Sequence, residues 1–149
     1  MKIALGADHG GFHLKEEIKG LLDEMGLSYH DFGTFSTESV DYPDLAAVVG
    51  KAVASGEYER GMLFCGTGIG ISIAANKIPG VRAALVHDVF SAKATRAHNN
   101  SNILAMGERV IGFGLAREVV KAWLGAEFEG GRHSTRVDKI TAIEAEFSK

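Results

Sequence analysis

Hydrophobic residues along the chain fall into two alternating patterns. Short apolar runs, each bounded by glycine or polar residues, are typical of buried strands and occur at residues 2–5, 28–32, 62–65, 81–86 and 103–106. Between and after them, apolar residues recur every three or four positions, which predicts helices over about 14–25, 43–53, 71–77, 88–98, 115–123 and 134–147. The polar residues 34–41 predict a loop.

Strands that alternate with helices predict an α/β fold in which a parallel sheet is covered by helices on both faces. The length of 149 residues suits one domain, residues 1–149. Ligands of such sheets bind beyond the carboxyl ends of the strands. Candidate site residues are therefore those at or just beyond the carboxyl ends of the predicted strands, namely Asp8, His9, residues 65–70 and Asp88.

Composition narrows the expected partners and compartment. The net charge is −3 and no basic run is present, so neither nucleic acid nor a membrane is an expected partner. No apolar stretch is long enough to cross a bilayer, and the first residues turn to glycine, aspartate and histidine too early for a signal peptide. The single cysteine cannot form an internal disulfide, which favours a cytoplasmic protein.

The glycine-rich stretch FCGTGIGISIAANK, residues 64–77, matches neither common phosphate loop. A P-loop needs a lysine followed by serine or threonine after its last glycine, and here Ile71 and Ser72 follow Gly70. A dinucleotide fingerprint needs G-x-G-x-x-G, whereas this loop reads G-x-G-x-G. The glycines alone do not distinguish a functional loop from a tight strand-to-helix turn in which glycine allows close packing.

Cys65 favours the functional interpretation of this loop. It lies at a predicted strand end, just before a predicted helix N-terminus, where exposed N–H groups stabilise anions and lower the pKa of a thiol. The same N–H groups can stabilise an oxyanion formed beside the thiolate. A buried structural cysteine is the alternative, and the surrounding glycines argue against it.

The DHGG turn and His98 each have both a functional and a structural interpretation. Asp8 and His9 begin the turn DHGG and can bind sugar hydroxyls or phosphate, although Asp8 can equally cap the first helix. His98 can act as a general acid or base, although the asparagine-rich stretch that follows it is typical of a turn. No spacing of histidine and cysteine predicts a metal site.

Arginines supply the candidate phosphate site. If residues 130–136 form the first turn of the last helix, Arg132 and Arg136 lie four residues apart on one face. Two guanidinium groups at this spacing repel each other unless an anion lies between them, and a phosphate suits them well. The alternative is two solvated arginines, paired with Glu129 or Asp138. Arg109 is a third candidate cation.

Taken together, these segments resemble a known family over almost the whole chain. DHGG, DYPD, CGTGIGISIAANK, RAHNNSN, GERV and GGRHSTRV occur in the order found in type B ribose-5-phosphate isomerases, at residues 8–11, 41–44, 65–77, 96–102, 107–110 and 130–137. The wider family includes galactose-6-phosphate and allose-6-phosphate isomerases. The resemblance implies a Rossmann-like three-layer α/β/α sandwich with a five-stranded parallel sheet. It also implies a homodimer or a dimer of dimers, without metal or organic cofactor.

The resemblance also implies a role for each candidate residue. Cys65 is the base that moves a proton between C1 and C2, His98 assists ring opening, and Thr67 shuttles a proton between O1 and O2. A second branch of the family lacks the cysteine and carries glutamate at the position of Ile71. The expected sugar contacts are Asp8, His9, Gly66, Thr67, Gly68, Ile69, Gly70 and Asn99, and the expected phosphate contacts are Arg109, Arg132 and Arg136.

The expected function is interconversion of ribose 5-phosphate and ribulose 5-phosphate through an enediolate, in the pentose phosphate pathway. The resemblance further implies that each active site combines residues of two subunits. A hexose-6-phosphate isomerase of the same family and a non-enzymatic sugar-phosphate-binding module are the alternatives. The loop at 34–41 is a candidate determinant of sugar length, but its residues do not indicate which length.

Overall fold

The computed structural model describes residues 1–148, and in this part of the chain five parallel strands form one sheet. The strand order is β2-β1-β3-β5-β4. The strands are β1 (Lys2–Ala7), β2 (Ser28–Asp31), β3 (Arg60–Cys65), β4 (Ala83–Leu85) and β5 (Ile103–Gly107). The predicted parallel sheet is thus confirmed, and β4 is shorter than the apolar run at 81–86 because only Ala83–Leu85 pair with β5.

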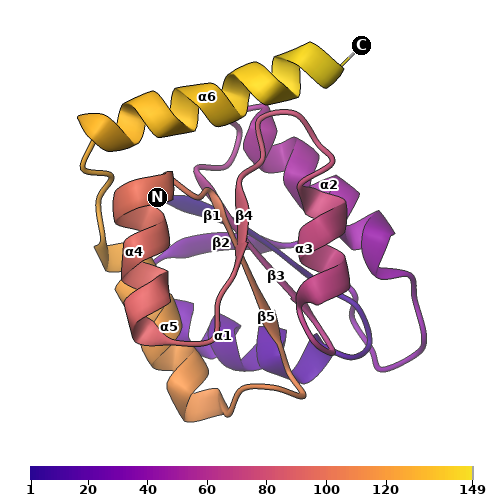
Figure 1. Cartoon of the computed structure of the whole chain (residues 1–149). Coiled ribbons are helices and arrows are strands. Elements are labelled where there is room, and N and C mark those ends of the chain that lie inside the picture. The colour runs from indigo at the N-terminus through magenta and orange to yellow at the C-terminus, as the bar shows by residue number, and fades with distance from the viewer. Residues whose placement is uncertain (149) are drawn as a thin grey trace.

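Helices cover both faces of the sheet, as the alternating pattern predicts (Figure 1). One apolar cluster joins the sheet to α1 (Phe12–Glu24), α4 (Val89–Asn99) and α5 (Phe113–Gly125). A second cluster joins the other face to α2 (Tyr42–Ala54) and α3 (Ile69–Ala75). The molecule is therefore a Rossmann-like three-layer α/β/α sandwich. No helix among the described residues is long and apolar enough to cross a membrane.

The register of the central strands determines which loops meet. Ala7 of β1 pairs with Phe64 of β3, and Cys65 pairs with Gly107 of β5. Because all three strands are parallel, the turns that follow them emerge at the same edge of the sheet. Asp8, the glycine-rich turn and Arg109 are thereby brought together.

The last helix, α6 (Arg132–Phe147), lies outside the two helix layers and contacts α4 (Figure 1). It begins two residues before the predicted boundary, since Gly130 and Gly131 adopt positive φ angles of 70° and 58° and form the turn that leads into it. Within this chain its apolar stripe is largely uncovered. Val137 is buried, but the side chains that follow are 50%, 59% and 79% exposed at Ile140, Ile143 and Phe147.

Candidate active site

Asp8 organises the turn between β1 and α1. Its Oδ1 accepts hydrogen bonds from the backbone N–H groups of Gly10, at 2.8 Å, and Gly11, at 3.2 Å. A β-carbon on Gly11 would lie 2.3 Å from the carbonyl carbon of Phe64, so only glycine allows this turn to pack on β3. Asp8 does not cap α1, because the N-cap residue is Gly11 and the helix start has no side-chain cap hydrogen bond, so the capping interpretation is wrong. The two hydrogen bonds instead close the DHGG turn and hold the Asp8 carboxylate at the carboxyl edge of the sheet.

His9 links this turn to the loop at 34–41. Its Nδ1 accepts a hydrogen bond from the backbone N–H of Val40 at 3.2 Å. The neutral ring therefore keeps its proton on Nε2, where it can donate to a ligand. The loop proposed to govern sugar length thus contacts a residue predicted to bind substrate.

Cys65 lies inside the glycine-rich turn. Its Sγ accepts a hydrogen bond from the backbone N–H of Gly68 at 3.1 Å, and the residue is only 5% exposed. Gly68 has a φ of 79°, and a β-carbon there would lie 2.8 Å from the backbone of Met106, so glycine is needed for the turn to close around the sulfur. Cys65 is buried, as the structural alternative required, but a backbone donor aimed at its sulfur stabilises a thiolate.

Thr67 and Ile69 form the exposed part of the same turn. The Thr67 Oγ1 accepts a hydrogen bond from the backbone N–H of Ile69 at 3.2 Å, which leaves its hydroxyl hydrogen available for another acceptor. Ile71, by contrast, is fully buried in the core beside α2. Its position therefore offers no acid–base group and no access to a ligand.

Arg109 and Tyr42 border the glycine-rich turn. The Arg109 guanidinium lies so close to Gly66 that a β-carbon on this glycine would stand 3.4 Å from Nη1. The Tyr42 ring packs against Gly70, where a β-carbon would come within 2.6 Å of it. Sequence reasoning missed Tyr42 as a site residue, although the DYPD segment that contains it was part of the resemblance.

A partly buried hydrogen bond to His87 holds the end of β5 beside this turn. The backbone N–H of Gly107 donates to Nε2 of His87 at 2.8 Å. Burial lowers the pKa of His87, despite the opposing charge of Asp88, which keeps this ring a neutral acceptor. Asp88 itself accepts a hydrogen bond from the backbone N–H of Ser91 at 2.7 Å, so it caps α4.

The remaining predicted residues lie at the other end of the sheet, where the strands begin. They are His98, Asn99, Arg132 and Arg136. His98 and Asn99 end α4, and the chain then returns to the start of β5. At this end of the sheet, the backbone N–H of Gly61 donates to the carbonyl oxygen of Asn102 at 2.9 Å. Gly61 lies four residues before Cys65 on β3. Four strand residues span about 13 Å, so His98 and Cys65 of one chain do not meet.

The two predicted phosphate ligands of α6 belong to these remaining residues. Arg132 is the first residue of α6 and Arg136 lies one turn further, and both side chains are exposed. They flank His133, whose ring stacks on that of His98 at a centroid distance of 4.2 Å. The structure thus divides the predicted site into one group around Cys65 and Arg109 and another around His98.

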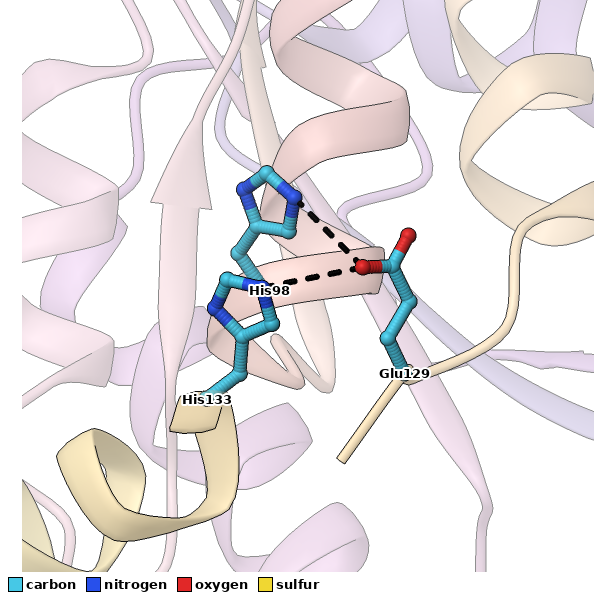
Figure 2. Close-up of side chains that lie close together, drawn as sticks. All are labelled: His98, Glu129 and His133. Atoms are coloured by element: carbon cyan, nitrogen blue, oxygen red, sulfur yellow. Dashed lines mark ion pairs between the residues drawn. The ribbon is translucent and has the colours of Figure 1, made fainter. Parts of the chain in front are cut away.

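A cluster that sequence reasoning missed accompanies His98 (Figure 2). The Glu129 Oε1 lies 3.8 Å from Nε2 of His98 and 3.6 Å from Nε2 of His133. Burial lowers the pKa of His133, and the nearby charges of His98 and Arg132 lower it further. Glu129 and His133 are four residues apart, but only the fold brings His98 to them, so spacing alone did not indicate the cluster.

Comparisons with known proteins find relatives that match almost the whole chain. Residues 3–140 match the family model described as Ribose/Galactose Isomerase. A Bacillus subtilis (strain 168) protein, provisionally named a sugar phosphate isomerase, is 61% identical over 145 residues, which are 97% of either chain. Ribose-5-phosphate isomerase B of Escherichia coli (strain K12) is 55% identical over 143 residues, which are 96% of either chain.

One further relative and a solved structure extend the comparison. D-erythrulose-4-phosphate isomerase of Pectobacterium atrosepticum is 46% identical over 145 residues, covering 97% of this chain and 95% of the relative. The structure of ribose-5-phosphate isomerase B from Clostridium thermocellum superimposes with a TM-score of 0.98 at 56% identity. This match covers 99% of this chain and 100% of the other.

Proposed function

Because the chain belongs to the ribose/galactose isomerase family and is an isomerase, we propose that it interconverts D-ribose 5-phosphate and D-ribulose 5-phosphate. The observation that carries this proposal is the Cys65 sulfur, held 3.1 Å from the Gly68 N–H at the carboxyl edge of the sheet. A base beside a backbone donor is the arrangement that proton transfer next to a carbonyl requires.

The reaction proceeds by proton transfer at this turn. The Cys65 thiolate takes the proton from C2 of the open-chain aldose, and the electron pair moves onto O1 to form an enediolate. Backbone N–H groups of the glycine-rich turn stabilise this negative oxygen. The thiol then returns its proton to C1, while the exposed hydroxyl of Thr67 moves a proton from O2 to O1. The products differ from the substrate only in the positions of two hydrogens.

The complete site combines two subunits of a homodimer. Cys65 and His98 of one chain lie at opposite edges of its sheet, about 13 Å apart along β3 alone. A twofold axis that brings the His98 group to the partner's glycine-rich turn creates two equivalent sites. His98 then protonates and deprotonates the ring oxygens of the closed sugar, and Asn99 binds a hydroxyl.

The exposed apolar stripe of α6 supports this assembly. Ile140, Ile143 and Phe147 line a cavity of about 750 Å³ together with Arg82 and Asn99. Contiguous exposed apolar surface of this kind is typical of a protein–protein interface. An interface here covers the second half of α6 and reaches Asn99, the residue after His98, where a neighbouring subunit is needed to complete the site.

The phosphate binds among three arginines. Arg109 comes from the turn beside Gly66 of one subunit, whereas Arg132 and Arg136, at the start of α6, come with the His98 group of the other subunit. His9, which keeps a donor at Nε2, follows β1 at the same edge of the sheet and is a further candidate contact of the phosphate. The free cysteine supports a reducing compartment such as the cytoplasm, where the pentose phosphate pathway supplies this substrate.

A substrate panel tests the proposed function. We expect kcat/KM to be greatest with ribose 5-phosphate, compared with allose 6-phosphate, galactose 6-phosphate and erythrulose 4-phosphate. A preference for a six-carbon or a four-carbon sugar would move the assignment to another member of the family. Binding without turnover of any of the four would instead support the sugar-phosphate-binding module.

A further inference from the structure

His98, Glu129 and His133 bring three potential metal-ligand atoms close together (Figure 2). Their ligand atoms all lie within 4.8 Å of one another, and the two nitrogen–oxygen distances are 3.8 Å and 3.6 Å. Two ligands that each lie about 2.1 Å from a tetrahedral zinc ion stand about 3.4 Å apart. The two nitrogen–oxygen separations therefore need to shorten by only a few tenths of an ångström to accept an ion, and the two nitrogens lie within 4.8 Å of each other.

The chemistry of the donors selects the kind of ion. Two imidazole nitrogens and one carboxylate form the ligand set of many zinc sites that keep an open position for water. Imidazole suits Zn²⁺, Co²⁺, Ni²⁺ and Cu²⁺, whereas Mg²⁺ and Ca²⁺ prefer oxygen ligands. The neighbouring Arg132 and Arg136 repel a cation, so the bound charge is better tolerated when an anion occupies them.

One side chain must turn for the ion to bind. The two imidazole rings are nearly parallel, with an interplanar angle of 11°, so their nitrogen lone pairs do not yet converge. His133 is held in place by burial, with 9% of its side chain exposed, whereas the His98 side chain is 45% exposed at the end of α4. His98 is therefore the ring that is free to rotate toward the metal.

We propose that His98, Glu129 and His133 form a binding site for a divalent transition-metal ion, and that the bound ion inhibits the enzyme. Coordination occupies Nε2 of His98, so this nitrogen can no longer exchange protons with the sugar. The inhibitory effect rests on the proposed role of His98, whereas binding itself does not. The ion is an inhibitor and not a cofactor, so removal of metal leaves the activity intact.

Direct titration with Co²⁺ tests the site independently of catalysis. We expect about one Co²⁺ per chain, with d–d absorption bands, in the EDTA-treated native protein and in Cys65→Ala. Glu129→Gln should weaken binding by more than about 10-fold, the least that loss of even an outer-shell partner costs. Glu127→Gln is the matched control, because Glu127 is exposed two residues earlier in the same segment and should bind Co²⁺ like the native protein.

Two results would overturn the site. Equal Co²⁺ affinity in Glu129→Gln and Glu127→Gln would show that the carboxylate is not a ligand. Loss of binding in Cys65→Ala, together with sulfur-to-cobalt charge transfer in the native spectrum, would move the ion to the thiol. The native protein's isomerase activity would stand in either case.

Inhibition is measured separately on the same variants. Zn²⁺ should lower turnover of the native enzyme and of Glu127→Gln, EDTA should restore it, and Glu129→Gln should resist. If Co²⁺ binds as expected while Zn²⁺ leaves native turnover unchanged, the inhibitory part is wrong and His98 has no proton-transfer role. If Zn²⁺ inhibits Glu129→Gln as strongly as the native enzyme, inhibition arises at another residue.

Discussion

At the scale of single residues, the Gly68 N–H is the feature that separates Cys65 from an ordinary buried cysteine. The sulfur belongs to the apolar cluster beside α2 and α3, and an uncompensated thiolate would be unfavourable there. The hydrogen bond of 3.1 Å offsets part of this cost and fixes the sulfur relative to the turn. Burial and reactivity are therefore compatible at this position.

Replacement of Cys65 by alanine should abolish catalysis and largely preserve substrate binding. General acid–base groups contribute about 10²- to 10⁴-fold to a rate, and loss of the base removes transition-state stabilisation more than ground-state affinity. We expect kcat to fall by at least about 100-fold, while the Kd for ribose 5-phosphate measured by calorimetry changes little. Cys65→Ser is the matched control, because serine keeps the shape of the side chain but its hydroxyl is far less acidic than the thiol. Native turnover in either variant would exclude the thiol as the base.

At the scale of secondary-structure elements, the start of α6 and the ion pair beneath α1 have different roles. The α6 arginines are exposed, so they cost little to the fold and remain available to a ligand. Lys15 of α1, by contrast, is fully buried, and its Nζ donates to both carboxylate oxygens of Asp31, each at 2.6 Å. Substitution of the α6 arginines should therefore change substrate binding, whereas loss of the Lys15–Asp31 ion pair should lower the free energy of unfolding.

Arg132→Ala and Arg136→Ala should each raise KM by about 10- to 100-fold, as expected when a charged hydrogen bond to phosphate is lost. Inorganic phosphate should compete with the substrate in the native enzyme. Lys139→Ala, an exposed cation further along α6, is the control and should leave KM unchanged. Equal KM values in all three variants would show that Arg132 and Arg136 are solvated surface residues that do not bind the phosphate.

Asp31→Asn should destabilise the protein by about 3 kcal/mol, because the buried Lys15 ammonium loses its close charge partner and keeps only the more distant carboxylate of Glu16, at 3.8 Å. Burial alone would raise the pKa of Asp31, but hydrogen bonds from Lys15 and Lys19 hold it below its usual value. The folded state therefore binds this proton less tightly than the unfolded state, and the stabilisation is present above about pH 4 and lost as the pH falls further.

Urea unfolding at several pH values measures this difference. The gap between native protein and Asp31→Asn should be largest near neutral pH and should narrow below about pH 4. Glu57→Gln, which changes an exposed carboxylate, should show no comparable gap at any pH. A gap that is independent of pH would mean that the carboxylate charge of Asp31 does not stabilise the fold.

At the scale of the whole molecule, periodicity predicted the parallel sheet and its helices because each element buries one face in the same core. Cys65 and Asp8 could be placed at one edge of the sheet for the same reason, since Cys65 ends β3 and Asp8 directly follows β1. The cluster of His98, Glu129 and His133 could not be predicted, because its members are close only after α6 returns to α4. The uncovered stripe of α6 also escaped prediction, since periodicity indicates a face but not what covers it.

The separation of Cys65 from His98 predicts that two defective chains can complement each other. In a twofold dimer with shared sites, a hybrid of Cys65→Ala and His98→Asn chains has one site with both substitutions and one site with neither. Random reassembly makes about half of the dimers hybrid, so roughly a quarter of native activity should return. The two inactive variants are dissociated together, reassembled and assayed, and native mass spectrometry measures the hybrid fraction.

A mixing control and one contrary result complete the test of the shared site. Variants that are mixed without dissociation should stay inactive, because no hybrids form. If both residues served a site within one chain, each site of the hybrid would still carry one substitution, and activity would remain at background despite confirmed hybrids. That outcome would require a movement within one chain larger than the length of β3 that separates the two groups, about 13 Å for the four residue steps from Gly61 to Cys65.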